Sequence, residues 1–230
     1  MPNHVSLQPL PFLAVVFACL ALYATSALAE EQELLPNPEG IVAYCFDGDT
    51  IKLTDRRVVR LAGIDTPEVR HGQDPAQYFA REARDILDGH VKGQKVLLYT
   101  ANEPGKDSYG RIIAEARLKD GTSLSEIMIA EGAAFYYPHK DLSPALGTRL
   151  LAIQKEAIAN RIGMWKHLLA LPLARQKYVG NKASLRFFPV DCPEAQRIKP
   201  RNKVLFGALM DAFTAGYAPA RICLFWPTQP

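Results

Sequence analysis

Two short polar strings in the first half of the chain carry groups that suit phosphodiester hydrolysis. The first is Asp47-Gly48-Asp49-Thr50, and the second runs from Arg60 to Glu68 as Arg-Leu-Ala-Gly-Ile-Asp-Thr-Pro-Glu. Carboxylate oxygens hold hard divalent cations such as calcium, and an arginine grips a phosphate by two parallel hydrogen bonds. A cation, a phosphate grip and one spare carboxylate are the parts that such hydrolysis needs.

Short apolar runs bounded by turn residues predict the strands that position these strings. A helix is expected after the third run, with Asp74 as its cap, Pro75 in its first turn and Gly89 at its end. The strands are expected over 40–46, 50–54, 58–64, 94–100 and 111–118.

Two further helices follow the strands. Ser123 and Glu126 form a capping-box pattern for a helix over 124–131. Ser143 and Pro144 open a longer helix that Gly163 ends. Five strands with a helix inserted after the third match a small closed barrel of the oligonucleotide/oligosaccharide-binding type. The expected fold class is therefore α+β, a five-stranded OB-fold-like β-barrel with three packed helices and a C-terminal extension of unknown fold.

Length and charge divide the chain further. Its 230 residues, 48% of them hydrophobic, suffice for one domain with a core and additional segments. The net charge is only +3, but the residues from Leu169 onward include nine basic and three acidic ones. Such a tail either attracts an anionic polymer or forms a solvated surface. We expect a linker over 30–39, the barrel domain over 40–168 and a basic extension over 169–230, in which 203–215 has a helical pattern.

The first 29 residues have the pattern of a signal peptide. An uncharged apolar stretch over 10–28 ends at the small-x-small sequence Ala27-Leu28-Ala29. No Lys or Arg precedes it, so an uncleaved membrane anchor is the alternative. Cleavage of this segment on export to the periplasm or the medium would leave three cysteines, Cys45, Cys192 and Cys223. A disulfide between the two tail cysteines is expected in an oxidising compartment, with Cys45 free in a buried strand.

Residues 40–167 resemble the staphylococcal nuclease (thermonuclease) family. The matching pieces are the two opening strings, then Asp107-x-Tyr109-Gly110-Arg111, then Gly163-Met164-Trp165. Each piece alone is a weak signal, whereas all of them in this order within a barrel pattern are a strong one. The resemblance does not extend to residues 170–230.

The resemblance implies a role for each polar residue. Asp49, Asp65 and the backbone carbonyl of Thr66 would hold Ca²⁺, and Glu68 would be the general base. Arg60 and Arg111 would bind the non-bridging phosphate oxygens. The substrate-binding residues would be Tyr109, Tyr136 and Tyr137, by stacking on bases.

A structural explanation stands beside each of these roles. The aspartates of the first string would satisfy backbone donors in a tight turn, Arg60 would pair with a neighbouring carboxylate, and Glu68 would cap a turn. Packing in the core is the alternative for the tyrosines. Ser108 departs from the family, whose type member has lysine there, and Arg70 or His71 are candidates to replace that phosphate contact.

The function expected from these features is an exported, calcium-dependent nuclease. It would cleave DNA and RNA with little sequence preference and leave 3′-phosphate ends, with no stable protein partner and with a membrane only if the N-terminal segment is uncleaved. The alternative is a non-catalytic OB-fold module that binds nucleic acid or protein. A third possibility is that the tail docks the nuclease onto a partner or the cell envelope.

Overall fold

The computed structural model describes residues 33–69, 75–101, 105–140, 142–223 and 226–228. The expected signal peptide, Arg70, His71 and Asp74 lie outside this set. Among the described residues, no helix has the length and apolar character that a membrane crossing requires.

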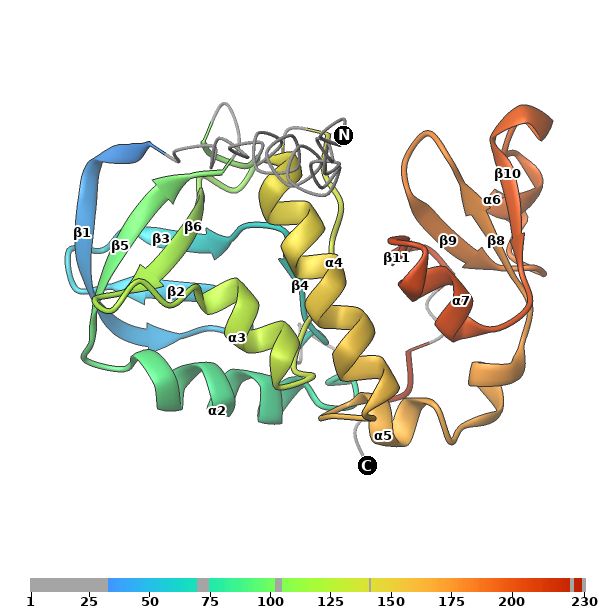
Figure 1. The fold of residues 1–230 in the computed structure, drawn as a ribbon, viewed down its shortest axis with the longest axis horizontal. Coiled ribbons are helices and arrows are strands. Elements are labelled where there is room, and N and C mark those ends of the chain that lie inside the picture. Colours follow the sequence, from blue (N-terminus) through green and yellow to red (C-terminus); the bar gives the residue numbers. More distant parts are fainter. Residues whose placement is uncertain (1–32, 70–74, 102–104, 141, 224–225, 229–230) are drawn as a thin grey trace, which may run out of the picture. The chain divides into compact units, whose positions relative to one another are not determined.

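Five strands close a barrel in the order β1-β2-β3-β6-β5 (Figure 1). Strands β3 and β6 pair in parallel, and the other neighbours pair antiparallel. The expected α+β, OB-fold-like barrel is therefore confirmed. The strands are β1 (Leu34–Cys45), β2 (Thr50–Leu53), β3 (Val58–Leu61), β5 (Lys95–Thr100) and β6 (Ile112–Leu118).

Two strand boundaries differ from expectation. Strand β1 begins at Leu34, inside the stretch predicted as a linker, because Leu34 pairs with Tyr99 of β5. The register shifts between Leu34 and Glu39, where the two prolines cannot donate hydrogen bonds. The strand predicted over 58–64 is two strands, since Gly63 adopts φ 76 between β3 and β4 (Ile64–Asp65). Strand β4 pairs with β7 (Phe135–Tyr136).

Three helices cover the barrel, namely α2 (Ala80–Val91), α3 (Leu124–Ala130) and α4 (Pro144–Ala159) (Figure 1). Their apolar faces join the barrel core through residues such as Leu87, Met128 and Leu150, all of which are inaccessible to solvent. Ser123 and Ser143 cap α3 and α4 as expected, by accepting hydrogen bonds from backbone N–H groups. Helix α2 begins at Ala80, later than predicted, after Phe79 in a left-handed conformation.

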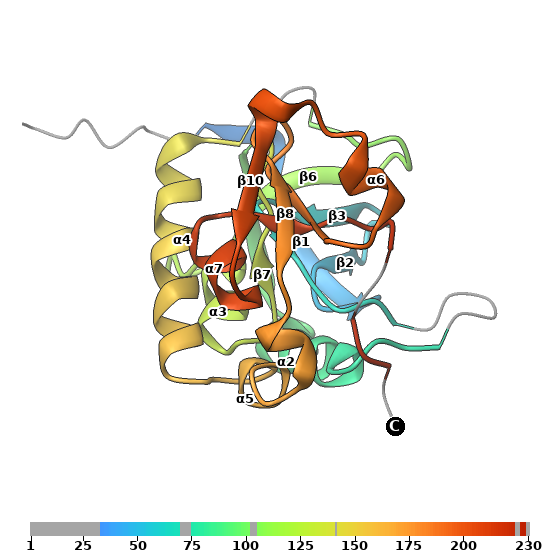
Figure 2. The same cartoon turned by 90° about the vertical axis from the view of Figure 1, so that its right-hand side faces the viewer.

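The C-terminal extension is a folded sheet in the order β10-β8-β9-β11 (Figures 1 and 2). A second core joins it to the end of the barrel domain, with the Trp165 ring 4.9 Å from the Phe213 ring. The strands are β8 (Tyr178–Asn181), β9 (Arg186–Pro189), β10 (Lys203–Phe206) and β11 (Ala218–Pro219). The helices are α5 (Trp165–Leu168), η1 (Pro172–Arg175), α6 (Pro193–Gln196), η2 (Pro200–Asn202) and α7 (Leu209–Thr214).

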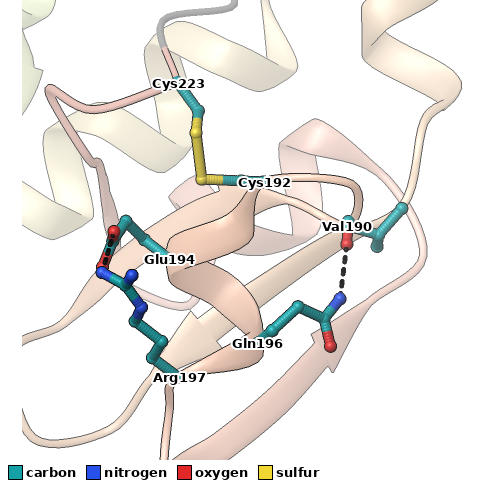
Figure 3. Close-up of a disulfide and its surroundings, with 6 residues drawn as sticks. All are labelled: Val190, Cys192, Glu194, Gln196, Arg197 and Cys223. Atoms are coloured by element: carbon teal, nitrogen blue, oxygen red, sulfur yellow. Dashed lines mark hydrogen bonds and ion pairs between the residues drawn. A yellow bond between two sulfur atoms is a disulfide. The ribbon is translucent and has the colours of Figure 1, made fainter.

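The helix predicted over 203–215 was wrong for its first half. Lys203 and Phe206 pair with the two ends of β8, so strand hydrogen bonding overrides the helical pattern up to Gly207. Only α7 is helical. The expected disulfide between Cys192 and Cys223 is confirmed (Figure 3), with the two Cα atoms 5.9 Å apart. Cys45 is free and buried at the end of β1, also as expected.

Candidate active site

The loop between β1 and β2 presents the first acidic string. Asp47 accepts a hydrogen bond from the backbone N–H of Asp49 at 3.0 Å, which closes a tight turn. A Cβ atom at Gly48 would lie 2.9 Å from both Thr66 Cγ2 and Ala83 Cβ. Glycine at this position therefore lets the first string approach the second.

Arg60 lies between the two buried aspartates. Its Nη1 is 2.8 Å from Asp49 Oδ2, and its Nη2 is 2.6 Å from Asp65 Oδ1. Both aspartates are less than 7% exposed. The register of β2 and β3 explains this meeting, because Arg60 pairs with Thr50, the residue after Asp49. The two carboxylates thus converge on one guanidinium.

Hydrogen bonds fix the Asp49 carboxylate in place. Oδ2 accepts from the backbone N–H of Thr66 at 3.1 Å and from the Thr66 hydroxyl at 3.2 Å. Oδ1 accepts from the Thr50 hydroxyl at 2.8 Å. A buried carboxylate held by this many donors has a defined orientation toward the site.

Glu68, the last residue of the second string, points to the same place. Its side chain is 41% exposed, with Oε1 3.5 Å from Nη2 of Arg221. Its backbone is held on both sides by Gln77, whose Oε1 accepts from Glu68 N–H and whose N–H donates to the Glu68 carbonyl, each at 2.9 Å. Glu68 is therefore an accessible carboxylate on a fixed backbone.

Arg111 enters from the start of β6. Asp107 accepts hydrogen bonds from the Arg111 backbone N–H at 3.0 Å and from its Nε at 2.7 Å. Nη1 lies 3.3 Å from the Thr50 hydroxyl. Tyr109 in the same loop is 80% exposed, and its ring centroid lies 5.4 Å from the Arg111 guanidinium carbon.

These groups face one open cavity of about 500 Å³. Widely separated segments of the chain meet there, and the lining includes Asp49, Arg60, Glu68, Tyr109, Arg111 and Arg221. Asp65 and Thr66 line an adjoining cavity, which shares Glu68 and Arg221 with the first.

The other two predicted tyrosines have different positions. Tyr136, on β7, lines a separate cavity beside Gly147 and Leu142. The Tyr137 ring lies beneath the Arg186 guanidinium, with 3.7 Å between the guanidinium carbon and the ring centroid. Neither is among the described residues that line the cavity around Arg60.

Arg221 and Gln77 were not anticipated from the sequence. Arg221 lies 156 residues from Asp65 in the sequence, and its Nη2 donates a hydrogen bond to Asp65 Oδ1 at 3.2 Å. The only signal it left was its membership of the basic tail. Gln77 lies in the loop before α2, where no spacing relates it to Glu68.

The cluster contains more carboxylates than guanidinium groups, and part of it is buried away from water. Burial, followed by the nearby Asp49 carboxylate, raises the pKa of Asp47 to about 8. Burial also raises the pKa of Asp65 to about 6, against the lowering effect of Arg60. For Arg60, burial acts to lower the pKa, but the carboxylates of Asp49, Asp65 and Asp47 raise it overall.

The donor chemistry fits a hard divalent cation. Two buried carboxylates that converge on a single guanidinium offer oxygen ligands of the kind that calcium prefers. Among the described residues no cluster of three or more Asp, Glu, His or Cys side chains is arranged to hold a metal. Asp49, Asp65 and the Thr66 carbonyl would therefore form an incomplete protein shell.

The OB-type barrel and the cavity lined by carboxylate and guanidinium groups together indicate the class to which this protein belongs. Residues 58–167 match the family model described as staphylococcal nuclease homologue. The chain is 31% identical over 136 residues to an uncharacterized endonuclease of Escherichia coli, covering 58% of this chain and 80% of that protein. It is 33% identical over 133 residues to the thermonuclease of Staphylococcus intermedius, covering 55% and 75%.

A longer but weaker similarity reaches the C-terminal extension. Endonuclease YhcR of Bacillus subtilis is 26% identical over 219 residues, which cover 83% of this chain and 18% of that protein. The chain belongs to the staphylococcal nuclease family. The enzyme class expected from the sequence, a nuclease, is thereby confirmed.

Proposed function

We propose that the protein is a calcium-dependent nuclease that hydrolyses DNA and RNA with little sequence preference and leaves 3′-phosphate ends. The observation that carries the proposal is the meeting of Asp49, Arg60, Glu68 and Arg111 at one cavity. Structural roles alone do not require two arginines and an accessible carboxylate to line the same open space. Nuclease relatives make nucleic acid the substrate class.

The two arginines bind the phosphate in this proposal. Asp49 and Asp65 hold the guanidinium of Arg60, and Asp107 holds that of Arg111. Guanidinium groups fixed before substrate binds need little reorganisation as charge builds up on the non-bridging oxygens. They therefore favour the transition state over the ground state.

Glu68 is the general base. It accepts a proton from water, whose oxygen attacks phosphorus as the bond from phosphorus to the 5′ oxygen breaks. The 5′ oxygen leaves and takes up a proton from solvent water, and the other strand end keeps the 3′-phosphate. The exposed carboxylate and the Gln77-held backbone suit this role, since a base must reach water from a fixed position.

Asp49, Asp65 and the Thr66 carbonyl would hold Ca²⁺. When bound, the ion would polarise the phosphoryl oxygen and help to orient the water. Asp47, which also lines the cavity, supports the loop by accepting the Asp49 N–H. Tyr109, exposed at the cavity, is placed to stack on a base of either nucleic acid.

A digestion assay on plasmid DNA and on RNA tests the proposal, with calcium, with other divalent ions and with chelator. We expect cleavage with calcium and none in chelator. Glu68→Gln and Arg60→Ala should lower the rate by about 10²-fold or more, and end-group analysis should find 3′-phosphates. Glu156→Gln on the exposed face of α4 and Arg84→Ala are the matched controls. Cleavage that persists in chelator, or wild-type rates in either site variant, would overturn it.

We also propose that the protein is exported, to the periplasm or the medium. The disulfide between Cys192 and Cys223 supports this, because such bonds persist in oxidising compartments. Fractionation of cells that express the full chain, with a blot for the protein, is the test. Recovery of the protein from the cytosol alone would exclude export.

A further inference from the structure

The C-terminal extension brings a third guanidinium into the nuclease cavity. Nη2 of Arg221 lies 3.2 Å from Oδ1 and 3.5 Å from Oδ2 of Asp65, and 3.5 Å from Oε1 of Glu68. The side chain is 57% exposed and lines the cavity with Arg60 and Arg111. The residue belongs to a part of the chain outside the match to the family model.

The backbone on either side of Arg221 is fixed. Just before it, β11 pairs with β9, and the N–H of Ala220 donates to the Phe187 carbonyl at 2.9 Å. Just after it, Cys223 is bonded to Cys192, at the start of α6 (Figure 3). A backbone anchored within two residues on both sides loses little further freedom when its side chain binds a ligand.

The segment is anchored again beyond the disulfide. Nε1 of Trp226 donates to the Tyr78 carbonyl at 3.1 Å, and its ring lies 5.6 Å from that of Phe135 on β7. Arg221 and Trp226 thus both line the adjoining cavity with Asp65 and Glu68. Arg221 is the segment's charged residue at the cavity.

Neutralising Asp65 is an insufficient reason for an arginine at this position. Arg60 already pairs with Asp65 at the shorter distance of 2.6 Å. The Arg221 side chain is 57% exposed, so part of its guanidinium stays open to solvent instead of being buried against Asp65. The ion pairs of Arg221 with described residues use Nη2, which leaves Nε and Nη1 for another acceptor. A guanidinium fork of this kind matches a phosphate.

We propose that Arg221 is a substrate-binding residue that holds a phosphate of the nucleic-acid strand next to the phosphate that is cleaved. Arg60 and Arg111 bind the phosphate that is cleaved. Arg221 binds the adjacent phosphate, on the side where Asp65 and Glu68 lie. The disulfide positions Arg221 for this contact. The proposal rests on the proposed nuclease function and assigns part of the extension to the same site.

Kinetics on single-stranded DNA test the proposal, with Arg221→Ala compared with Arg197→Ala. Arg197 lies in the same extension, near the disulfide, and pairs only with Glu194 among the residues drawn in Figure 3. We expect Arg221→Ala to raise KM about tenfold while kcat changes less than threefold. The fall of affinity with salt should become shallower by about 0.7 on a double-logarithmic plot, the loss of one phosphate contact. Arg221→Gln provides the same test if the alanine variant does not fold.

Binding measurements separate this proposal from the proposed function. Fluorescence anisotropy of a labelled oligonucleotide, with calcium, compares the Glu68→Gln variant with the Glu68→Gln, Arg221→Ala double variant. Weaker binding by the double variant supports the phosphate contact of Arg221, whether or not the wild-type chain cleaves nucleic acid. Absence of cleavage by the wild-type chain would refute only the proposed nuclease function. Equal binding and an unchanged KM overturn the contact. Faster cleavage by Arg221→Ala also overturns it, since the arginine would then block the site.

Reduction tests the role of the disulfide. Dithiothreitol, or the Cys192→Ser, Cys223→Ser double substitution, should raise KM as Arg221→Ala does. Neither treatment should add to the effect of Arg221→Ala, because both act on the same contact. A reduced enzyme with the KM of the oxidised enzyme would show that the disulfide does not position Arg221.

Discussion

Removal of Arg60 should destabilise the fold as well as the chemistry. Its guanidinium is the partner of two aspartates, and the three side chains are only 11%, 6% and 9% exposed. Removing one partner of a buried ion pair costs about 3–5 kcal/mol, because the remaining charge stays buried. Arg221 still faces Asp65 at 3.2 Å, and Thr66 still donates to Asp49, so we expect a loss near the lower end.

Urea denaturation in chelator, followed by tryptophan fluorescence, measures the effect of Arg60→Ala on the free energy of unfolding. The slope with urea should stay constant and the midpoint should fall. Arg84→Ala is the control, since its pair with Asp85 is exposed and should contribute less than about 1 kcal/mol. Adding Asp49→Asn to Arg60→Ala should restore part of the loss. Equal midpoints for Arg60→Ala and Arg84→Ala would refute the reasoning.

Three further results follow from local geometry. Gly163→Ala should destabilise the fold by more than about 1 kcal/mol, because φ is 55 and the new Cβ would lie 2.3 Å from the Glu131 carbonyl oxygen. Gly89→Ala inside α2 should instead stabilise it by up to about 1 kcal/mol. Urea titrations measure both changes in the free energy of unfolding. Burial raises the pKa of the Cys45 thiol to about 12, so a thiol reagent at pH 8 should label it only after denaturation. Tyr109→Ala should weaken binding of single-stranded DNA by about 1–3 kcal/mol without changing the melting temperature.

The part of the site that lies in short strings could be predicted from sequence. Asp49 and Asp65 each belong to a turn or strand end whose residue types are locally recognisable, and Arg60 lies on a strand of the same small meander. The barrel followed from apolar runs and turn residues, and it brings these strings together. Prediction of the barrel succeeded because local sequence patterns and the overall fold are consistent with each other.

Long-range pairing limited the rest. Arg221 reaches Asp65 across 156 residues, and nothing near either residue encodes that contact. Lys203–Phe206 has apolar residues that suit a helix, but it pairs with β8 and becomes a strand. Tyr136 and Tyr137 lie beside each other in sequence, yet one faces the cavity beside α4 and the other lies under Arg186. Tertiary context decides each of these cases.

The extension is part of the folded enzyme, which determines how its role can be studied. Phe213 of α7 packs against Trp165 with ring centroids 4.9 Å apart, and against Phe135 at 5.6 Å. Deletion of residues 172–230 would therefore expose Trp165 and remove Arg221 in the same step. Loss of activity after such a deletion would not separate packing from substrate binding. Substitution of Arg221 alone leaves this core intact, so it isolates the contribution of the extension to the nuclease site.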